Sequence, residues 1–221
     1  MNEFEKKDVL LKHPFRLVCS GASGTGKTTF VSLLLKNMDE ICDTKFDKTV
    51  FSYSQEQPLY EKIREERPDI VWVNGFDNDI EKQYLSDPSE NKLLILDDQM
   101  ETLCNDLNFQ TFFTKKSHHM NISVIFMVQN VYYRSKCMRT INLNTTSYAL
   151  FKSPRDMSQV HTLARQLYPG NSNYVIESYK EATKIPFGYL LLDIDPRTPD
   201  AYRLRTRILP GEEMIIYRER S

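Results

Sequence analysis

The stretch "CSGASGTGKTTF", residues 19–30, is the strongest indication of fold in the chain. It contains a glycine, four variable residues, a second glycine, a lysine and a threonine, the spacing of a Walker A loop whose backbone N–H groups surround nucleotide phosphates. "FRLVCSG", residues 15–21, predicts a strand directly before this loop, and "TTFVSLLLKNM", residues 28–38, predicts a helix directly after it. The motif binds nucleotide in this strand–loop–helix context.

Each residue type in the loop suits phosphate binding. Glycines allow a tight backbone and a close approach of the ligand, and the helix that follows offers its positive N-terminal end. Lys27 is expected to reach the β- and γ-phosphates, and the hydroxyl of Thr28 to bind Mg²⁺. The predicted nucleotide-binding residues are Gly21, Ala22, Ser23, Gly24, Thr25, Gly26, Lys27, Thr28 and Thr29.

Strand-like and helix-like segments alternate along the rest of the chain. Further strands are predicted over residues 48–54, 69–75, 92–98, 121–129 and 145–152, helices over 57–67 and within 153–170, and a final strand pair over 189–195 and 202–209. This alternation predicts an α/β fold with a mostly parallel central sheet flanked by helices, and a nucleotide beyond the carboxyl ends of the strands. We expect one P-loop domain over residues 1–221, with a short polar segment at 1–13 and a C-terminal β-hairpin at about 188–209.

Bulk composition restricts the classes of partner. The 221 residues include 29 basic and 30 acidic side chains, so the net charge of −1 gives no support to nucleic-acid binding, and any DNA contact must come from local patches brought together by oligomerisation. The start of the chain lacks the apolar run of a signal peptide, and no stretch approaches about 18 apolar residues. Four widely spaced cysteines, Cys19, Cys42, Cys104 and Cys137, predict free thiols. We expect a soluble, intracellular protein without a membrane partner.

Acidic residues follow the predicted buried strand in "LLILDDQM", residues 93–100, in the manner of a Walker B motif. Asp97 is expected to hold Mg²⁺, and Asp98 stands where many P-loop ATPases place a glutamate that polarises the attacking water. Gln99 is a weaker candidate for that task. The alternative is a strand that simply ends in a polar turn.

Polar residues also follow the strand in "VIFMVQN", residues 124–130. Gln129 and Asn130 are candidates to hydrogen-bond the γ-phosphate or the attacking water, and a group in that position loses its partner on hydrolysis and reports the nucleotide state. A strand-end cap explains these residues equally well.

Two basic segments are candidates for contacts with a neighbouring subunit or with DNA. The first contains Arg134, Lys136 and Arg139, and the second contains Lys152 and Arg155. An arginine offered across a subunit boundary stabilises charge on a transferring phosphoryl group, although most surface arginines are only solvated.

A period of two is predicted to place Arg203, Arg205 and Arg207 on one strand face. That face suits phosphate-backbone contacts, or alternatively keeps a sheet edge soluble. His118 and His119 have no nearby partners for a metal site.

The motifs exclude one class of P-loop protein and leave others open. GTPase switches need N-K-x-D and D-x-x-G, whereas here Asn91-Lys92 is followed by two leucines, and Met100 stands where the glycine would be. A phosphotransferase with a basic lid over a small acceptor remains open. A structural clamp that binds ATP with little turnover also remains open.

The chain resembles a known family in "FRLVCSGASGTGKTTF", "LLILDDQM", "SHHMNISVIFMVQNVYYRSKCMRTINLN", "YALFKSPRD" and "GYLLLDIDPRTPDAYRLRTRILPGE". These stretches, between about residues 13 and 213, look like the genome-packaging ATPases of Maverick/Polinton elements and related DNA viruses. That family belongs to the FtsK–HerA superfamily, alongside the poxvirus packaging ATPase.

The resemblance implies an ATPase that works with ATP and Mg²⁺ as a homo-oligomeric ring, a pentamer or hexamer. Such a ring translocates double-stranded DNA into a capsid, with a capsid or portal-region protein as partner, in the host nucleus or at a viral assembly site, or associated with the virion. Gln129 matches the family's strand-end glutamine that senses the γ-phosphate. Arg139 is the first choice and Arg155 the second for the arginine acting in trans, and Asp98 departs from the superfamily's usual glutamate.

Overall fold

The computed structural model describes residues 6–103, 106–132 and 136–219. The strands are β1 (Arg16–Ser20), β2 (Lys48–Tyr53), β3 (Val71–Asn74), β4 (Lys92–Asp97), β5 (Ile122–Val128), β6 (Ser147–Phe151), β7 (Tyr189–Asp193), β8 (Leu204–Thr206) and β9 (Ile215–Tyr217). The helices are α1 (Lys27–Lys36), α2 (Met38–Ile41), α3 (Pro58–Glu66), α4 (Asn78–Tyr84), α5 (Met100–Leu103), α6 (Leu107–Thr111), the π-helical turn η2 (Phe112–Lys116), α7 (Ser117–His119), α8 (Lys136–Asn144), α9 (Ser158–Leu167) and α10 (Ser172–Ala182). Two 3₁₀ turns are η1 (Lys6–Val9) and η3 (Asp200–Tyr202).

The described strands form one nine-stranded sheet in the order β3-β2-β4-β5-β1-β6-β7-β8-β9. The six strands from β3 to β6 are parallel to one another, whereas the pairings of β6 with β7, β7 with β8 and β8 with β9 are antiparallel. Parallel strands bring their carboxyl ends to one edge of the sheet. The loops that follow β1, β4, β5 and β6 therefore share that edge, and β5 lies between the strand of the glycine loop and the strand of Asp97.

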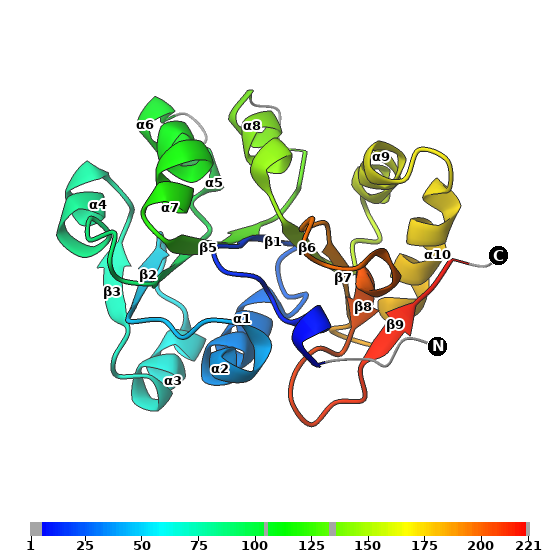
Figure 1. Cartoon of the computed structure of the whole chain (residues 1–221), viewed down its shortest axis with the longest axis horizontal. Coiled ribbons are helices and arrows are strands. Elements are labelled where there is room, and N and C mark those ends of the chain that lie inside the picture. The colour runs from blue at the N-terminus through cyan, green and yellow to red at the C-terminus, as the bar shows by residue number, and fades with distance from the viewer. Residues whose placement is uncertain (1–5, 104–105, 133–135, 220–221) are drawn as a thin grey trace.

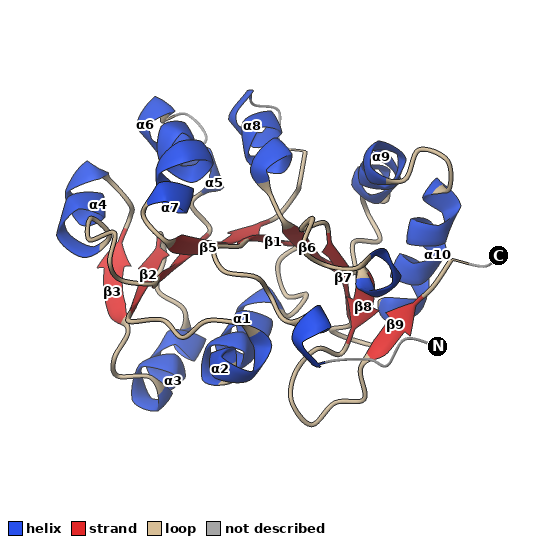
Figure 2. Cartoon of the chain, in the orientation of Figure 1, coloured by secondary structure: helices blue, strands red, loops and turns tan. Residues whose placement is uncertain are grey.

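Helices cover both faces of the sheet, as Figures 1 and 2 show. Helices α4 to α9 lie on one face, and α1, α2 and α3 lie on the other (Figure 1). Because a strand between two helix layers is buried on both faces, its apolar residues form a continuous run, as in the "KLLILDD" segment that predicted β4. The predicted α/β fold, with a mostly parallel sheet between helices, is confirmed.

The sheet separates two apolar cores, and alternate residues of each central strand enter different ones. In β4, Leu94 and Leu96 belong to the core that also contains residues of α8, α9 and α10. Leu93 and Ile95 belong to the core that also contains residues of α1 and α3. All four side chains are at most 1% exposed. Full burial of a leucine or isoleucine stabilises a fold by about 1.5–3 kcal/mol, so this strand is a major anchor of the sheet.

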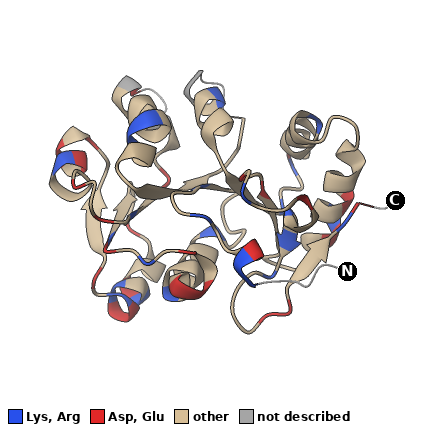
Figure 3. Cartoon of the chain, viewed as in Figure 1, with Lys and Arg blue, Asp and Glu red and all other residues tan. Residues whose placement is uncertain are grey.

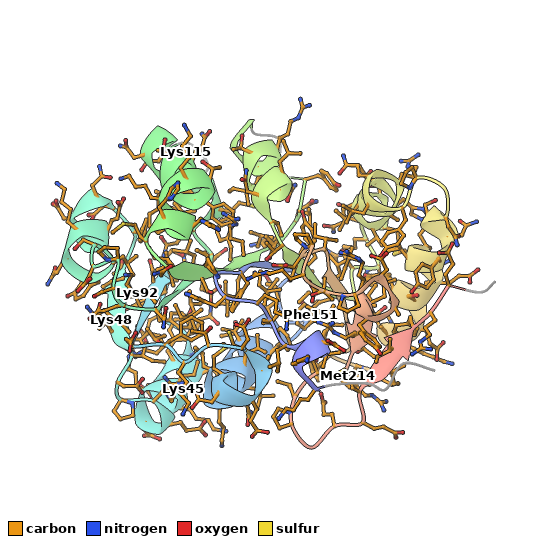
Figure 4. All side chains as sticks on the ribbon, viewed as in Figure 1. Lys45, Lys48, Lys92, Lys115, Phe151 and Met214 are labelled. Atoms are coloured by element: carbon orange, nitrogen blue, oxygen red, sulfur yellow. The ribbon has the colours of Figure 1, made fainter. Side chains whose placement is uncertain are left out.

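Two lysines at the amino-terminal edge of the sheet both contact Glu90, one through its carboxylate and the other through its backbone carbonyl oxygen. Lys48 and Lys92 start the neighbouring strands β2 and β4 and lie directly opposite each other, as their labels in Figure 4 show. The ammonium group of Lys48 pairs with the Glu90 carboxylate at 3.0 Å, and the buried ammonium of Lys92 donates to the carbonyl oxygens of Asp87 and of Glu90. These acceptors offset the repulsion between two like charges, and they lie at the edge opposite to the glycine loop.

The predicted C-terminal hairpin is confirmed, since β7 and β8 pair antiparallel, but β8 is shorter than the predicted segment 202–209. The elements that were not predicted include β9, which continues the sheet, and α10, which packs against α9. Helices α4, α6, α7 and α8 were not predicted either. Among the described residues, no helix is long and apolar enough to cross a membrane.

The expectation that Arg203, Arg205 and Arg207 share one exposed strand face is wrong. Arg205 is fully buried, because β8 lies between β7 and β9, and its guanidinium donates to the Asp193 carboxylate at 2.8 Å. Arg203 precedes the strand and Arg207 follows it with a φ of 55°. These side chains therefore do not form a row that could follow a phosphate backbone.

The buried ion pair of Arg205 with Asp193 gives a stability prediction. We expect Arg205→Met to lower the free energy of unfolding by about 3–5 kcal/mol, because it leaves a buried carboxylate without its charged partner. The double variant with Asp193→Leu should recover much of that loss. Urea unfolding measures both. Lys62→Met, which removes an exposed ion pair with Glu66, is the control and should change stability by less than about 1 kcal/mol.

Candidate nucleotide-binding site

The backbone of the loop between β1 and α1 requires its glycines. Gly24 and Gly26 have φ values of 78° and 96°, in the left-handed region that side chains disfavour. Gly21 lies so close to β6 that a Cβ atom there would be 2.7 Å from the Cβ atom of Phe151. The loop can therefore approach both the sheet and a ligand more closely than other residues would allow.

Lys27, at the start of α1, folds back over this loop. Its ammonium group donates to the carbonyl oxygen of Gly21 at 2.6 Å and to that of Ala22 at 3.0 Å, and the Thr25 hydroxyl donates to the same Ala22 oxygen at 2.7 Å. Burial lowers the pKa of Lys27, and the nearby carboxylate of Asp97 opposes that shift. The cation is therefore held in the centre of the loop by groups that phosphate oxygens can replace.

Asp97 ends β4 and is 4% exposed. Its Oδ2 atom accepts hydrogen bonds from the Tyr60 hydroxyl at 2.5 Å and from Gln57 Nε2 at 3.2 Å. The Oε1 atom of Gln57 in turn accepts from the Thr28 hydroxyl at 3.4 Å. One side chain therefore bridges the two predicted Mg²⁺ ligands, Thr28 and Asp97.

Burial raises the pKa of Asp97, while the hydrogen bond from Tyr60 acts in the opposite direction. Burial and the neighbouring carboxylate also raise the pKa of the Tyr60 hydroxyl, which therefore stays a donor. Neither Tyr60 nor Gln57 was predicted as a site residue. They lie about 40 positions before Asp97 in the sequence, beside Pro58 at the start of α3, and carry no motif.

A cavity of about 440 Å³ opens over the loop at the carboxyl edge of the sheet. It brings together predicted residues from β1, β4 and β5, namely Ser23, Gly24, Gly26, Lys27, Thr28, Thr29, Asp97, Asp98 and Gln129. The cavity is not lined by Gly21, Ala22 or Thr25. These residues instead make hydrogen bonds within the loop, through two carbonyl oxygens and the Thr25 hydroxyl. The roles assigned to these residues remain predictions.

Asp98 and Gln99, the two candidates for positioning water, point different ways. Asp98 has a φ of 53°, which is uncommon for a residue other than glycine, and its exposed side chain lines the cavity. Its carbonyl oxygen accepts from the Ser54 hydroxyl at 2.9 Å. Gln99 is buried away from the cavity and donates to the Ser52 hydroxyl oxygen at 2.5 Å. The geometry thus favours Asp98 over Gln99.

Gln129 and Asn130, which follow β5, also differ. Gln129 is exposed at the cavity wall. Asn130 faces the neighbouring loop, where its Nδ2 atom donates to the Asp156 carboxylate at 2.7 Å, and its Oδ1 atom accepts from the backbone N–H of Tyr132 at 2.7 Å. Asn130 therefore links the loop after β5 to the loop before α9 through hydrogen bonds.

Hydrogen bonds of a second side chain link the same loops. The buried Gln159 of α9 accepts hydrogen bonds from the backbone N–H of Val131 at 3.1 Å and from the Ser20 hydroxyl at 3.4 Å. Ser20 ends β1, just before the glycine loop. The loops that follow β1, β5 and β6 are thus connected by side chains, so a displacement of one affects the others.

The candidate trans-acting arginines lie outside the cavity. Arg139 is exposed on α8, and Arg155 is exposed in the loop between β6 and α9, next to Asp156. Arg134 lies outside the described residues, as does the side chain of Lys136. Neither Arg139 nor Arg155 lines the cavity of its own chain, and their predicted role across a subunit boundary stays a prediction.

Two of the four cysteines, Cys19 and Cys42, are buried free thiols, and burial raises the pKa of each. Cys104 and the side chain of Cys137 lie outside the described part of the chain. Within the described residues, no group of three or more His, Cys, Asp or Glu side chains could hold a metal ion. Any Mg²⁺ here would therefore depend on few protein ligands together with nucleotide phosphates, which is how Mg²⁺ commonly binds.

Comparison with known families gives a match at the phosphate loop. The family described as Poxvirus A32 protein matches residues 1–60, which contain β1, the loop and α1. The predicted resemblance to viral packaging ATPases is confirmed. No curated protein matches the chain in a sequence search.

Two solved structures share the fold over nearly the whole chain. The crystal structure of B204, the DNA-packaging ATPase from Sulfolobus Turreted Icosahedral Virus, has a TM-score of 0.58 at 12% identity, covering 96% of this chain and 100% of that one. The genome packaging NTPase B204 from Sulfolobus turreted icosahedral virus 2, in complex with AMPPCP, has a TM-score of 0.55 at 11% identity, with 93% and 97% covered. The chain therefore shares the fold of these two proteins, in agreement with the predicted P-loop ATPase fold.

The raised pKa of Asp97 predicts a pH-dependent gain in stability for Asp97→Asn. Because folding raises this pKa, the folded chain holds the proton more tightly than the unfolded chain, and ionisation of Asp97 costs folding free energy above the unfolded value. The cost is about 1.4 kcal/mol for each unit of the rise. Asp97→Asn removes it, so the gain in unfolding free energy should grow with pH and level off above the folded pKa.

Urea unfolding without nucleotide from about pH 4, close to the ordinary pKa of an aspartate, to pH 8 measures this gain. Asp79→Asn is the control, because it removes one negative charge at an exposed position that does not line the cavity. A gain that shrinks as the pH rises would contradict a raised pKa at Asp97.

Proposed function

We propose that this chain is an ATP-driven double-stranded DNA translocase that packages a viral or virus-like genome into a capsid. The observation that carries the proposal is the single cavity into which Lys27, Thr28, Asp97 and Gln129 converge. The fold it shares with a DNA-packaging ATPase over 96% of the chain supports the choice of DNA as substrate. In this proposal residues 1–221 act as one P-loop ATPase domain.

The cavity residues suit the binding of ATP with Mg²⁺. Thr28 and Asp97 offer the hard oxygen donors that Mg²⁺ prefers, on either side of Gln57. When bound, Mg²⁺ neutralises charge on the β- and γ-phosphates. Lys27 exchanges its two loop carbonyls for phosphate oxygens, and the loop N–H groups and the N-terminal end of α1 bind the rest of the phosphate chain.

Asp98 and Gln129 act at the reacting end of the nucleotide. Asp98 accepts a hydrogen bond from the attacking water and orients it, in place of the glutamate found in related ATPases. Its side chain is one methylene shorter than glutamate, and the left-handed backbone at this position sets the direction in which it points into the cavity. Gln129 donates to the γ-phosphate and loses this partner once the phosphate leaves.

The hydrogen bonds of Asn130 and Gln159 transmit the loss of the γ-phosphate to the surface of the chain. Loss of the phosphate frees Gln129, and the loop after β5 shifts together with Asn130. Because Asn130 is bonded to Asp156, the loop of Arg155 moves with it. A contact made by that loop on a neighbouring subunit therefore depends on the nucleotide state.

We propose a homo-oligomeric ring, a pentamer or hexamer, as the working form. The net charge of −1 means that one copy has no overall attraction for DNA. Figure 3 shows that η2 and α8 carry basic residues, whereas α3 mixes both signs and the charged residues of α2 are acidic. A ring concentrates such basic segments around a central channel, where they contact DNA phosphates. These contacts weaken as the salt concentration rises, because the release of counterions from DNA then gains less entropy. A capsid or portal-region protein is the proposed partner, in the host nucleus or at a viral assembly site.

Steady-state ATP hydrolysis with and without double-stranded DNA tests the proposal. We expect DNA to stimulate hydrolysis, and Lys27→Ala to abolish it because the phosphates lose their central cation. Lys36→Ala, at the exposed end of the same helix, is the matched control and should leave the rate unchanged. Hydrolysis that ignores DNA but responds to a small acceptor would indicate a phosphotransferase. Tight ATP binding without turnover would indicate a structural clamp.

Mixed rings identify the arginine that acts in trans. We expect Arg139→Ala or Arg155→Ala, whichever removes that arginine, to lower kcat by about 10³-fold. Mixing this inactive variant with Lys27→Ala should then partly restore hydrolysis, because one subunit supplies an intact phosphate loop and its neighbour supplies the arginine. An arginine that acts within its own subunit gives no such rescue.

A further inference from the structure

A second, apolar cavity of about 290 Å³ adjoins the phosphate cavity. Among the described residues, five large apolar side chains are exposed, and three of them, Leu33, Ile185 and Phe187, line this cavity. Their exposed fractions are 40%, 49% and 68%. Apolar surface gathered in this way at a functional site indicates a ligand or partner.

The two cavities adjoin and share part of their lining. Gly26, Thr29 and Phe187 line both of them. The phosphate cavity extends toward Asp97 and Gln129 at the ends of β4 and β5, whereas the apolar cavity lies beside the segments next to β7 and β8, on the other side of β1. A nucleotide whose γ-phosphate lies near Asp97 and Gln129 therefore has its other end directed toward the apolar cavity.

Phe187 is held in a conformation that costs energy. Its φ is 61°, which is an outlier for a bulky residue and is energetically unfavourable. A Cβ atom added to Gly26 would lie 3.1 Å from Cδ1 of this ring, so the ring rests directly on the phosphate loop. A strained and exposed aromatic ring against a phosphate loop is unfavourable unless a ligand uses it.

The loop that presents this ring is fixed by packing. A Cβ atom at Gly188 would lie 2.3 Å from the carbonyl oxygen of Ala182, so the chain passes close to the end of α10. The N–H of Gly188 donates to the carbonyl oxygen of Ile185 at 3.1 Å. Arg207, which also lines the cavity, has a positive φ of 55° as well. Two segments of the lining thus have a backbone conformation that is unusual for their residue types.

We propose that this cavity binds the nucleobase of the nucleotide and that the Phe187 ring stacks on it. The inference rests on the proposed function, because it assigns the second half of the same ligand. A volume of about 290 Å³ is at the small end of the range for ligand pockets, which suits a base rather than a whole nucleotide. Stacking on an aromatic face is available to every base, so Phe187 supplies affinity and the groups at the rim supply any selectivity.

Binding of ATP and of inorganic tripolyphosphate, both with Mg²⁺, separates the two cavities. We expect Phe187→Ala to weaken ATP binding about 10- to 100-fold, the range for loss of one base–aromatic stack. Tripolyphosphate has no base, so its affinity should change less than about twofold. Phe187→Trp should retain ATP binding. Lys184→Ala, in the same loop but outside the cavity, is the matched control.

Fluorescence of the Phe187→Trp variant gives a second readout. Its emission, compared with that of the wild-type chain with Trp72 alone, should be quenched by ATP and not by tripolyphosphate. Equal loss of both ligands in Phe187→Ala would mean that the ring only supports the phosphate loop. No loss of either would mean that the cavity has another occupant, such as a side chain of a neighbouring subunit.

Both of those results overturn the inference. The Lys27→Ala variant distinguishes this failure from failure of the proposed function. If the proposed function holds, that variant loses ATP and tripolyphosphate alike, whatever Phe187 does. If Lys27→Ala binds both ligands normally, the phosphate cavity itself is wrongly assigned.

Discussion

The candidate site depends on the hydrogen-bonded pairing of β5 between β1 and β4. This arrangement sets the spacing between the phosphate loop and Asp97, and it inserts Gln129 between them at the same edge. A parallel ladder resists sliding because a shift of one residue would turn every buried side chain to the other face. The site is therefore as rigid as the sheet, although its residues come from segments more than 100 positions apart in the sequence.

Within this frame the site is held ready by its own polar groups. Lys27 bonds to loop carbonyls and Asp97 bonds to Tyr60, so each charge has a partner despite its burial. Such partners limit the desolvation cost of keeping charges in a low-dielectric cavity. Nucleotide binding therefore replaces hydrogen bonds within the site by hydrogen bonds to the ligand. The binding free energy is the difference in free energy between these two hydrogen-bonded states.

Much of the fold was predictable because its signals are local. The glycine spacing, the apolar runs of β1, β4 and β5, and the acidic strand end each lie within a few residues. The missed features are those fixed by distant partners. Tyr60 and Gln57 join the site only through Asp97, and Arg205 reads as an exposed strand residue until β7 brings Asp193 beside it. Phe187 lacked any signal, since its role depends on a backbone conformation that sequence patterns do not reveal.

The two edges of the sheet limit how copies of this chain can meet. The edge strands β3 and β9 have only four and three residues, and exposed backbone at such short edges offers few N–H and C=O groups for edge-to-edge pairing. Continuous sheet extension from one copy to the next is thus disfavoured. Contacts between copies would instead be made by helices and strand-end loops, and the strand-end loops are the segments that line the nucleotide cavity.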